Sequence, residues 1–143
     1  MSDPFDLQRF VDAQDSGGTY DAVLAELRAG AKRGHWMWFV LPQLAGLGRS
    51  ATAQHYAISG LAEARAYLAH PVLGPRLREC AAALAELDTA DPVAVLGGVD
   101  AQKLRSSMTL FAAAAPDEPV FTRVLDHYFG GAEDPGTTRL LAR

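Results

Sequence analysis

The sequence predicts an all-α protein: a single compact domain over residues 1–143, built from about seven or eight short helices. Three observations support this class. Alanine is abundant while valine and isoleucine are few, which favours helix on intrinsic propensity. Apolar residues recur at helical spacing along most of the chain. No segment shows the strict alternation of a half-buried strand, and the apolar run 36–41 would have no partner strand.

Helix starts are marked by three Asp-Pro dipeptides, because aspartate caps free N–H groups and proline suits the first turn. They begin at Asp3, Asp91 and Asp134. We expect the first helix to end near Gln14 and a second to follow from Thr19 to about residue 30. Further helices are expected over 50–57, 61–70 and 73–87, the last with an apolar stripe that steps by four and three. Asp100 is the expected cap of a long helix, and a helix over 119–129 precedes the terminal one.

The composition and charge of the chain argue against several classes of function. The hydrophobic fraction of 49% and the charged fraction of 21% are typical of a globular protein. A net charge of −4 argues against nonspecific nucleic-acid binding, which needs a clustered cationic face. One cysteine, Cys80, excludes an intramolecular disulfide, and the longest apolar run is far too short to cross a bilayer. We therefore expect a cytoplasmic protein with no membrane or nucleic-acid partner; the oligomeric state stays open.

The aromatic stretch 34–50 is the most unusual part of the chain. It holds both tryptophans and ends in Gly46-x-Gly48-x-x-Ala51, which formally matches a dinucleotide-binding fingerprint. That fingerprint requires a strand before it, whereas this run is broken by Pro42 and followed by helices. Two interpretations of the glycine turn stay open: a site where Arg49 and Ser50 bind a phosphate or carboxylate, and a plain helix-capping turn.

Other candidate chemistry is sparse. The four histidines have no partners at metal-ligand spacing, so we expect no metal and no cofactor. Trp36 and Trp38 point in different directions on a helix, so one could be core while the other lines a pocket beside His35. In the long helix, Lys103 lies three and four residues before Ser106 and Ser107, which places a cation and two hydroxyls together. Packing through small residues explains these serines equally well.

Several motifs resemble a known family. They are Asp-Pro-Phe-x-Leu-x-Arg-Phe from Asp3, His-Trp-Met-Trp-Phe-x-x-Pro-Gln from His35, Gly-Leu-Gly-Arg-Ser from Gly46, and Lys-Leu-Arg-Ser-Ser-Met-Thr-Leu-Phe from Lys103. Together they are similar to the domain-of-unknown-function family numbered 1810, some of whose members are labelled calpastatin. The resemblance implies a small, mainly helical bacterial domain and carries no established activity.

A second likeness concerns the order of three segments: Leu47 to Arg49, then 103–111, then 119–130. This order is similar to that of the NAD/ADP-ribose-related hydrolases that include YbiA-like proteins. The likeness implies that Arg49 and Lys103 contact a pyrophosphate and that Trp36 or Trp38 stacks on a base.

These observations support two hypotheses, and they leave open whether the protein is an enzyme. In the first, the chain binds an anionic, nucleotide- or ADP-ribose-like ligand and possesses N-glycosidic hydrolase activity, with His35 as the acid–base group. The expected ligand-binding residues are polar or aromatic side chains set in apolar segments: Arg9, Gln14, Trp38, Gln43, Arg49, Ser50, Lys103 and Ser107. The alternative is a non-enzymatic helical protein-interaction module that acts through an exposed apolar patch.

Overall fold

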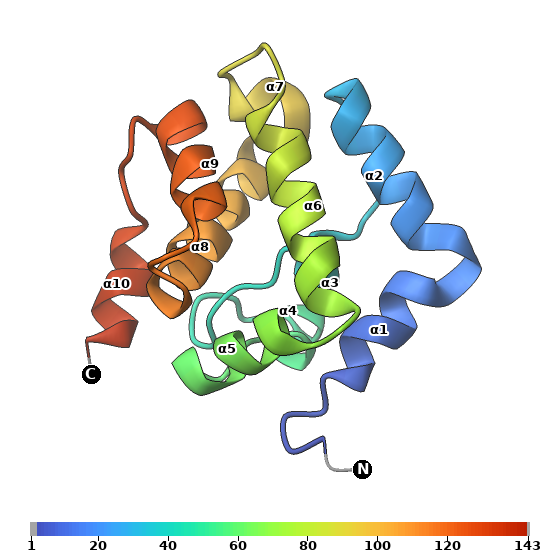
Figure 1. Cartoon of the computed structure of the whole chain (residues 1–143), viewed down its shortest axis with the longest axis vertical. Helices are drawn as coiled ribbons and strands as arrows, with labels where there is room; N and C mark the ends of the chain where they lie inside the picture. The colour runs from blue at the N-terminus through green and yellow to red at the C-terminus, as the bar shows by residue number, and fades with distance from the viewer. Residues whose placement is uncertain (1–2, 143) are drawn as a thin grey trace.

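The computed structural model describes residues 3–142, and the regular secondary structure in that range is helical (Figure 1). The all-α prediction is thereby confirmed. Ten α-helices and one 3-10 turn are present in the described part of the chain. Their bounds are α1 (Gln8–Asp15), η1 (Ser16–Gly18), α2 (Thr19–Ala29), α3 (Met37–Val40), α4 (Ala51–His55), α5 (Leu61–Ala69), α6 (Leu73–Ala85), α7 (Pro92–Leu96), α8 (Gly98–Ala114), α9 (Pro119–Phe129) and α10 (Pro135–Leu141).

The helices α5, α6, α8 and α9 pack on one another and form the centre of the molecule. Helix α2 packs on α6 on one side, with α1 next to α2 and α3, and α10 lies against α8 on the other side (Figure 1). The predicted stripe of α6 is in the core: Leu73, Leu77, Cys80 and Leu84 are all at most 1% exposed. Burial of such side chains stabilises the fold by roughly 1.5–3 kcal/mol each, so this stripe anchors the bundle.

Two of the three Asp-Pro dipeptides cap helices as predicted. Asp91 accepts hydrogen bonds from the N–H groups at the start of α7, and Asp134 accepts one from Thr137 N at 2.9 Å in α10. The prediction for Asp3 is wrong in position. Its carboxylate accepts hydrogen bonds from Leu7 N (2.8 Å) and Gln8 N (3.0 Å), and α1 begins only at Gln8. The turn before α1 includes Asp6 with a φ of 51°, which delays the helix.

Asp100 does not have the capping role predicted for it, and Thr19 does not cap α2 either. Helix α8 begins at Gly98, so Asp100 lies inside its first turn, and its carboxylate binds two lysines instead of backbone N–H groups. Thr19 is the first residue of α2, after Gly18 in the left-handed conformation, and its hydroxyl donates to Ser16 O. Neither α2 nor α8 therefore has a side-chain cap at its start.

The aromatic stretch does not form a strand. It forms the short helix α3 and then a loop of bends and turns that leads to α4, with one isolated parallel bridge between Leu44 and Ile58. Trp36 and Met37 are buried, whereas Trp38 and Phe39 are partly exposed. The two tryptophans therefore point in different directions, as predicted.

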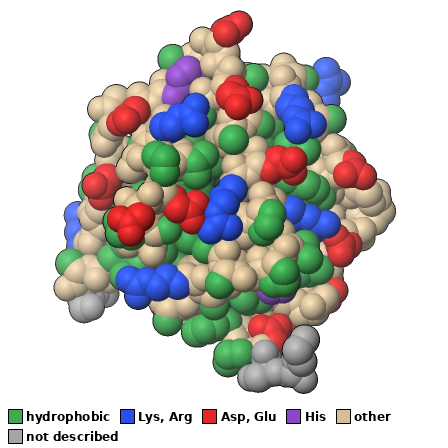
Figure 2. Space-filling model, in the orientation of Figure 1, with side chains coloured by type: hydrophobic (Ala, Val, Ile, Leu, Met, Phe, Trp, Pro, Cys, Tyr) green, Lys and Arg blue, Asp and Glu red, His purple; other side chains and the backbone are tan. Residues whose placement is uncertain are grey.

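Within residues 3–142, no helix combines the length and apolar character needed to span a bilayer. Figure 2 shows acidic and basic side chains interspersed on the face that it draws, with apolar side chains between them.

Candidate functional site

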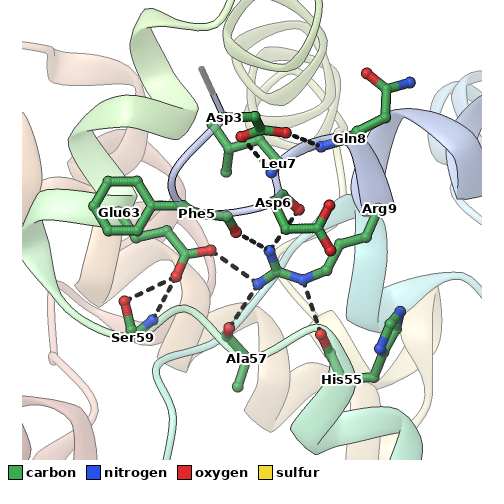
Figure 3. Close-up of polar contacts among 10 residues, drawn as sticks. All are labelled: Asp3, Phe5, Asp6, Leu7, Gln8, Arg9, His55, Ala57, Ser59 and Glu63. Carbon is green, nitrogen blue, oxygen red and sulfur yellow. Dashed lines mark hydrogen bonds and ion pairs between the residues drawn. The ribbon is translucent and has the colours of Figure 1, made fainter. Parts of the chain in front are cut away.

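Arg9, one of the predicted ligand-binding residues, is fully engaged inside the protein (Figure 3). A guanidinium has five N–H donors, and each has an oxygen partner here. The partners are His55 O (2.8 Å from Nε), Phe5 O (2.5 Å) and Asp6 O (2.7 Å) for Nη1, and Ala57 O (2.9 Å) and Glu63 Oε2 (2.8 Å) for Nη2. Glu63 is itself buried and also accepts from Ser59 N and Oγ. Arg9 therefore joins α1, the 55–59 loop and α5, with no donor left for a ligand.

Gln14 is also part of the interior. It is 1% exposed, and its amide donates to Phe39 O at 2.7 Å and to Tyr67 Oη at 3.3 Å. Its carbonyl oxygen accepts from Arg76 Nη1 at 3.2 Å. These contacts hold α1, α3 and α5 together, so Gln14 supports the fold at this point.

The residues predicted on the glycine turn lie on the loop before α4. Ser50 is the N-cap of α4, its Oγ accepting from Ala53 N at 3.0 Å, while Arg49 is exposed. The backbone carbonyl oxygen of Gln43 accepts a hydrogen bond from Ile58 N at 2.9 Å. Of the two interpretations of this turn, the geometry matches the helix cap.

Packing explains the two glycines of the turn. Gly46 has a φ of 100°, which only glycine adopts readily. A Cβ on Gly48 would lie 2.5 Å from the Cβ of Ala53. Arg49 accepts a hydrogen bond from Gln54 Nε2 at its backbone oxygen (3.0 Å), whereas Lys103 Nζ donates to Asp100 Oδ1.

Lys103 and Trp38, in contrast, are brought together. The Nζ of Lys103 lies 4.0 Å from the centroid of the Trp38 ring, on its face. The same ammonium donates to Asp100 Oδ1 at 3.1 Å, and Lys32 Nζ donates to Asp100 Oδ2 at 2.8 Å. Lys32 also donates to Gly34 O and lies 5.2 Å from the Trp36 centroid. We call Lys32, Asp100, Lys103 and Trp38 the lysine cluster.

Ser107 lies one turn after Lys103 on α8. It is fully buried, and its Oγ has no hydrogen-bond partner within the described part of the chain. Its neighbour Ser106 donates to Gln102 O at 3.1 Å in the preceding turn. Burial of both serines agrees with helix packing through small side chains, and the unpaired hydroxyl of Ser107 is the exception to the rule that buried polar groups are satisfied.

His35 lines a hollow of about 310 Å³. The other lining residues include Gly18 and Thr19 at the start of α2, and Glu26, Trp36 and Phe39. Glu26 accepts three hydrogen bonds at Oε1, from Arg33 N (2.6 Å), Gly34 N (2.9 Å) and Trp36 Nε1 (3.0 Å). Its Oε2 has no such bond to the residues described here, so it is available to a donor in the hollow.

Both acidic groups of this region are ionised near neutral pH. Burial would raise the pKa of Glu26, but the hydrogen bonds from Gly34, Arg33 and Trp36 lower it below its ordinary value. Burial likewise opposes ionisation of Asp100, and the hydrogen bonds from Lys32 and Lys103 outweigh it, which lowers the pKa. A fixed negative charge therefore faces the hollow, and the lysine cluster carries a net charge of +1.

A larger hollow of about 680 Å³ lies between the start of α1 and the α5–α6 junction. Its polar groups are already used by the backbone: the Asp3 carboxylate binds Leu7 N and Gln8 N, and His70 Nδ1 accepts from Val72 N and Leu73 N. Within residues 3–142, no group of three or more potential ligands could hold a metal ion. Cys80 is buried, and burial raises its pKa to about 12, so it is a structural thiol.

Sequence reasoning missed Glu26, Lys32 and Asp100. A signal for Lys32 is present, since Arg28, Lys32 and Arg33 form a basic cluster, but such a cluster is also typical of a helix C-terminus. Asp100 was assigned to a cap. No local pattern identifies Glu26, because its partners are seven to ten residues ahead in a loop.

Comparison with known proteins gives a family and a fold. A crystal structure of the conserved hypothetical protein Rv1873 from Mycobacterium tuberculosis is similar to this chain, with a TM-score of 0.95 and 52% sequence identity over 99% of both chains. A search of curated proteins found no match. The family model described as "Protein of unknown function (DUF1810)" matches residues 4–141. The chain therefore belongs to the DUF1810 family, as its motifs indicated.

Proposed function

We propose that the protein binds a nucleotide-like ligand in the hollow beside His35 and hydrolyses its N-glycosidic bond. The observation that supports this most is the composition of the hollow: an ionised carboxylate with a free oxygen, an imidazole, two aromatic rings and a helix start without a side-chain cap. Its volume of about 310 Å³ lies at the lower end of the 300–1,000 Å³ range of small-molecule sites.

Each part of such a ligand has a chemical counterpart. The Oε2 of Glu26 can accept hydrogen bonds from ribose hydroxyls, as carboxylates do in dinucleotide sites. Trp36 is only 2% exposed, so the partly exposed ring of Phe39 is the better surface for a base. The N–H of Thr19 donates to Ser16 O, and the next N–H groups of the 11-residue helix α2, which have no side-chain cap, favour an anionic group.

The same residues fit the chemistry of glycosidic cleavage. The bond between ribose C1′ and the base nitrogen breaks, its electron pair stays on the base, and His35 protonates that base. Positive charge develops on the ribose ring, and the Glu26 carboxylate stabilises it. A water oxygen then bonds to C1′ and releases its proton to solvent. Because Glu26 is held by three hydrogen bonds at Oε1, it needs no rearrangement to act.

The alternative, an interaction module, has less support. Among the described residues, the large apolar side chains that are exposed are Val93 at 55% and Val99 at 73%, both near the α7–α8 junction. Two valines are too few for the contiguous patch of several hundred Å² that marks a docking surface.

The test is a binding and turnover assay with NAD, ADP-ribose and nucleoside monophosphates. Calorimetry would measure the affinity and chromatography would detect the released base. Glu26→Gln keeps an oxygen for the three hydrogen bonds to Oε1 and removes only the charge. We expect this variant to bind the substrate and to lose turnover by about 100-fold or more, the size of one electrostatic contribution.

Glu86→Gln is the matched control, because Glu86 is exposed and lies outside the hollow. It should behave as the parent protein. His35→Gln tests the proton donor and should reduce turnover by about 100-fold with unchanged affinity. If none of these ligands binds, or if Glu26→Gln leaves turnover unchanged, the proposed function is refuted.

A further inference from the structure

The lysine cluster carries more positive charge than its own carboxylate neutralises. Lys32 and Lys103 share Asp100, whose two oxygens each accept one ammonium, at 2.8 Å and 3.1 Å. Two ammonium groups and one carboxylate leave a net charge of +1. Because the side chains of Lys32, Lys103 and Asp100 are only 8%, 18% and 18% exposed, this charge is poorly screened by solvent.

The ammonium of Lys103 also has unused hydrogen-bonding capacity. An ammonium has three N–H donors, and Lys103 uses one of them, on Asp100 Oδ1. A second can point to the face of Trp38, 4.0 Å away, which leaves at least one N–H without an oxygen partner among residues 3–142. Lys32, by comparison, uses two donors, on Gly34 O and Asp100 Oδ2. Lys103 is thus the more available cation.

The N-terminus of α8, like the Lys103 ammonium, favours a bound anion. The helix has 17 residues, and Gly97 before it offers no side-chain cap. Asp100 would be the natural acidic group for this helix start, yet its carboxylate is engaged by both lysines. The positive end of α8 and the excess ammonium therefore act in the same direction, towards a bound anion.

We propose that the lysine cluster is a binding site for a phosphate-class oxyanion, with Lys103 as the direct ligand. Lys32 and Asp100 position the Lys103 ammonium: Asp100 holds it at 3.1 Å and Lys32 keeps Asp100 ionised. The site stands apart from the hollow at His35, because the cluster residues do not line that hollow. It does not depend on the function proposed for the hollow.

Trp38 gives the site its own spectroscopic signal. The other tryptophan, Trp36, is 2% exposed and hydrogen-bonded to Glu26, so a change at Lys103 should alter mainly Trp38. Titration with inorganic pyrophosphate, and separately with orthophosphate, at low ionic strength should produce a saturable change in tryptophan fluorescence. Trp38→Phe should abolish the change and retain binding by calorimetry.

Three substitutions test the charge argument in both directions. Lys103→Gln should weaken pyrophosphate binding about tenfold or more, the effect of one charged hydrogen bond. Asp100→Asn raises the net charge from +1 to +2 and should tighten binding about threefold to tenfold. Arg123→Gln is the control, because it removes the same charge from an exposed position on α9 and should leave the affinity within twofold.

Thermal unfolding without ligand shows whether each variant is folded before it is titrated. If the cluster only holds the 32–36 loop on α8, Lys103→Gln and Asp100→Asn will both lower the midpoint and neither will alter pyrophosphate affinity. That outcome overturns the proposal, as does the absence of saturable binding in the parent protein. Loss of binding at the hollow leaves this site unaffected, so the two proposals fail separately.

Discussion

The strongest prediction concerns stability and the Arg9 network. Replacement Arg9→Met removes five hydrogen bonds and leaves Glu63, whose side chain is 4% exposed, without its cation (Figure 3). Breaking a buried ion pair by removing one partner costs about 3–5 kcal/mol. The measured loss in unfolding free energy should therefore be at least about 3 kcal/mol, a large part of the 5–15 kcal/mol of a typical domain.

The second perturbation separates charge from hydrogen bonding. Glu63→Gln keeps an oxygen for Ser59 N and Oγ, at 2.9 Å each, and should cost about 1–3 kcal/mol. In the double variant, no carboxylate is left unpaired. Its cost should consequently be at least about 1 kcal/mol less than the sum of the single costs.

Urea denaturation followed by circular dichroism would measure these free energies. Arg123→Met is the matched control, because Arg123 is exposed on α9, and it should change stability by less than about 0.5 kcal/mol. A cost below about 1 kcal/mol for Arg9→Met, or full additivity in the double variant, would refute the conclusion that Arg9 acts as a structural clamp. It would also return Arg9 to the set of candidate ligand-binding residues.

Two further predictions concern the pH dependence of stability and the glycine turn before α4. The pKa values of Glu26 and Asp100 are lower folded than unfolded, so each group contributes stability above the unfolded carboxyl pKa of about 4, which is lost as the pH falls below it. Unfolding midpoints should thus decline below about pH 5, and Glu26→Gln should make the decline shallower; an unchanged slope would contradict this. Gly48→Ala would place a Cβ 2.5 Å from Ala53 Cβ and should cost about 1–3 kcal/mol by thermal denaturation. The double variant with Ala53→Gly should recover most of that loss, whereas no recovery would show that the clash is not the cause.

Six of the predicted site residues separate into two groups once their partners are known. Arg9, Gln14 and Ser50 have partners in the chain that occupy their polar groups. His35 lines the hollow, and Trp38 and Lys103 belong to the lysine cluster; these side chains remain available for contacts with a ligand. Nothing in their local sequence distinguishes the groups, because the partners of Arg9 lie up to 54 positions away.

The fold class, the family and the apolar faces of the helices could be predicted from the sequence alone. Periodicity of three and four residues is a local property, and the α6 stripe from Leu73 to Leu84 is buried as that periodicity requires. Which polar side chains remain free depends on the packing of distant segments. Hydrogen-bond donors are satisfied by whatever oxygen the packing brings within reach, so Glu26, Lys32 and Asp100 acquire their roles from contacts that no local pattern contains.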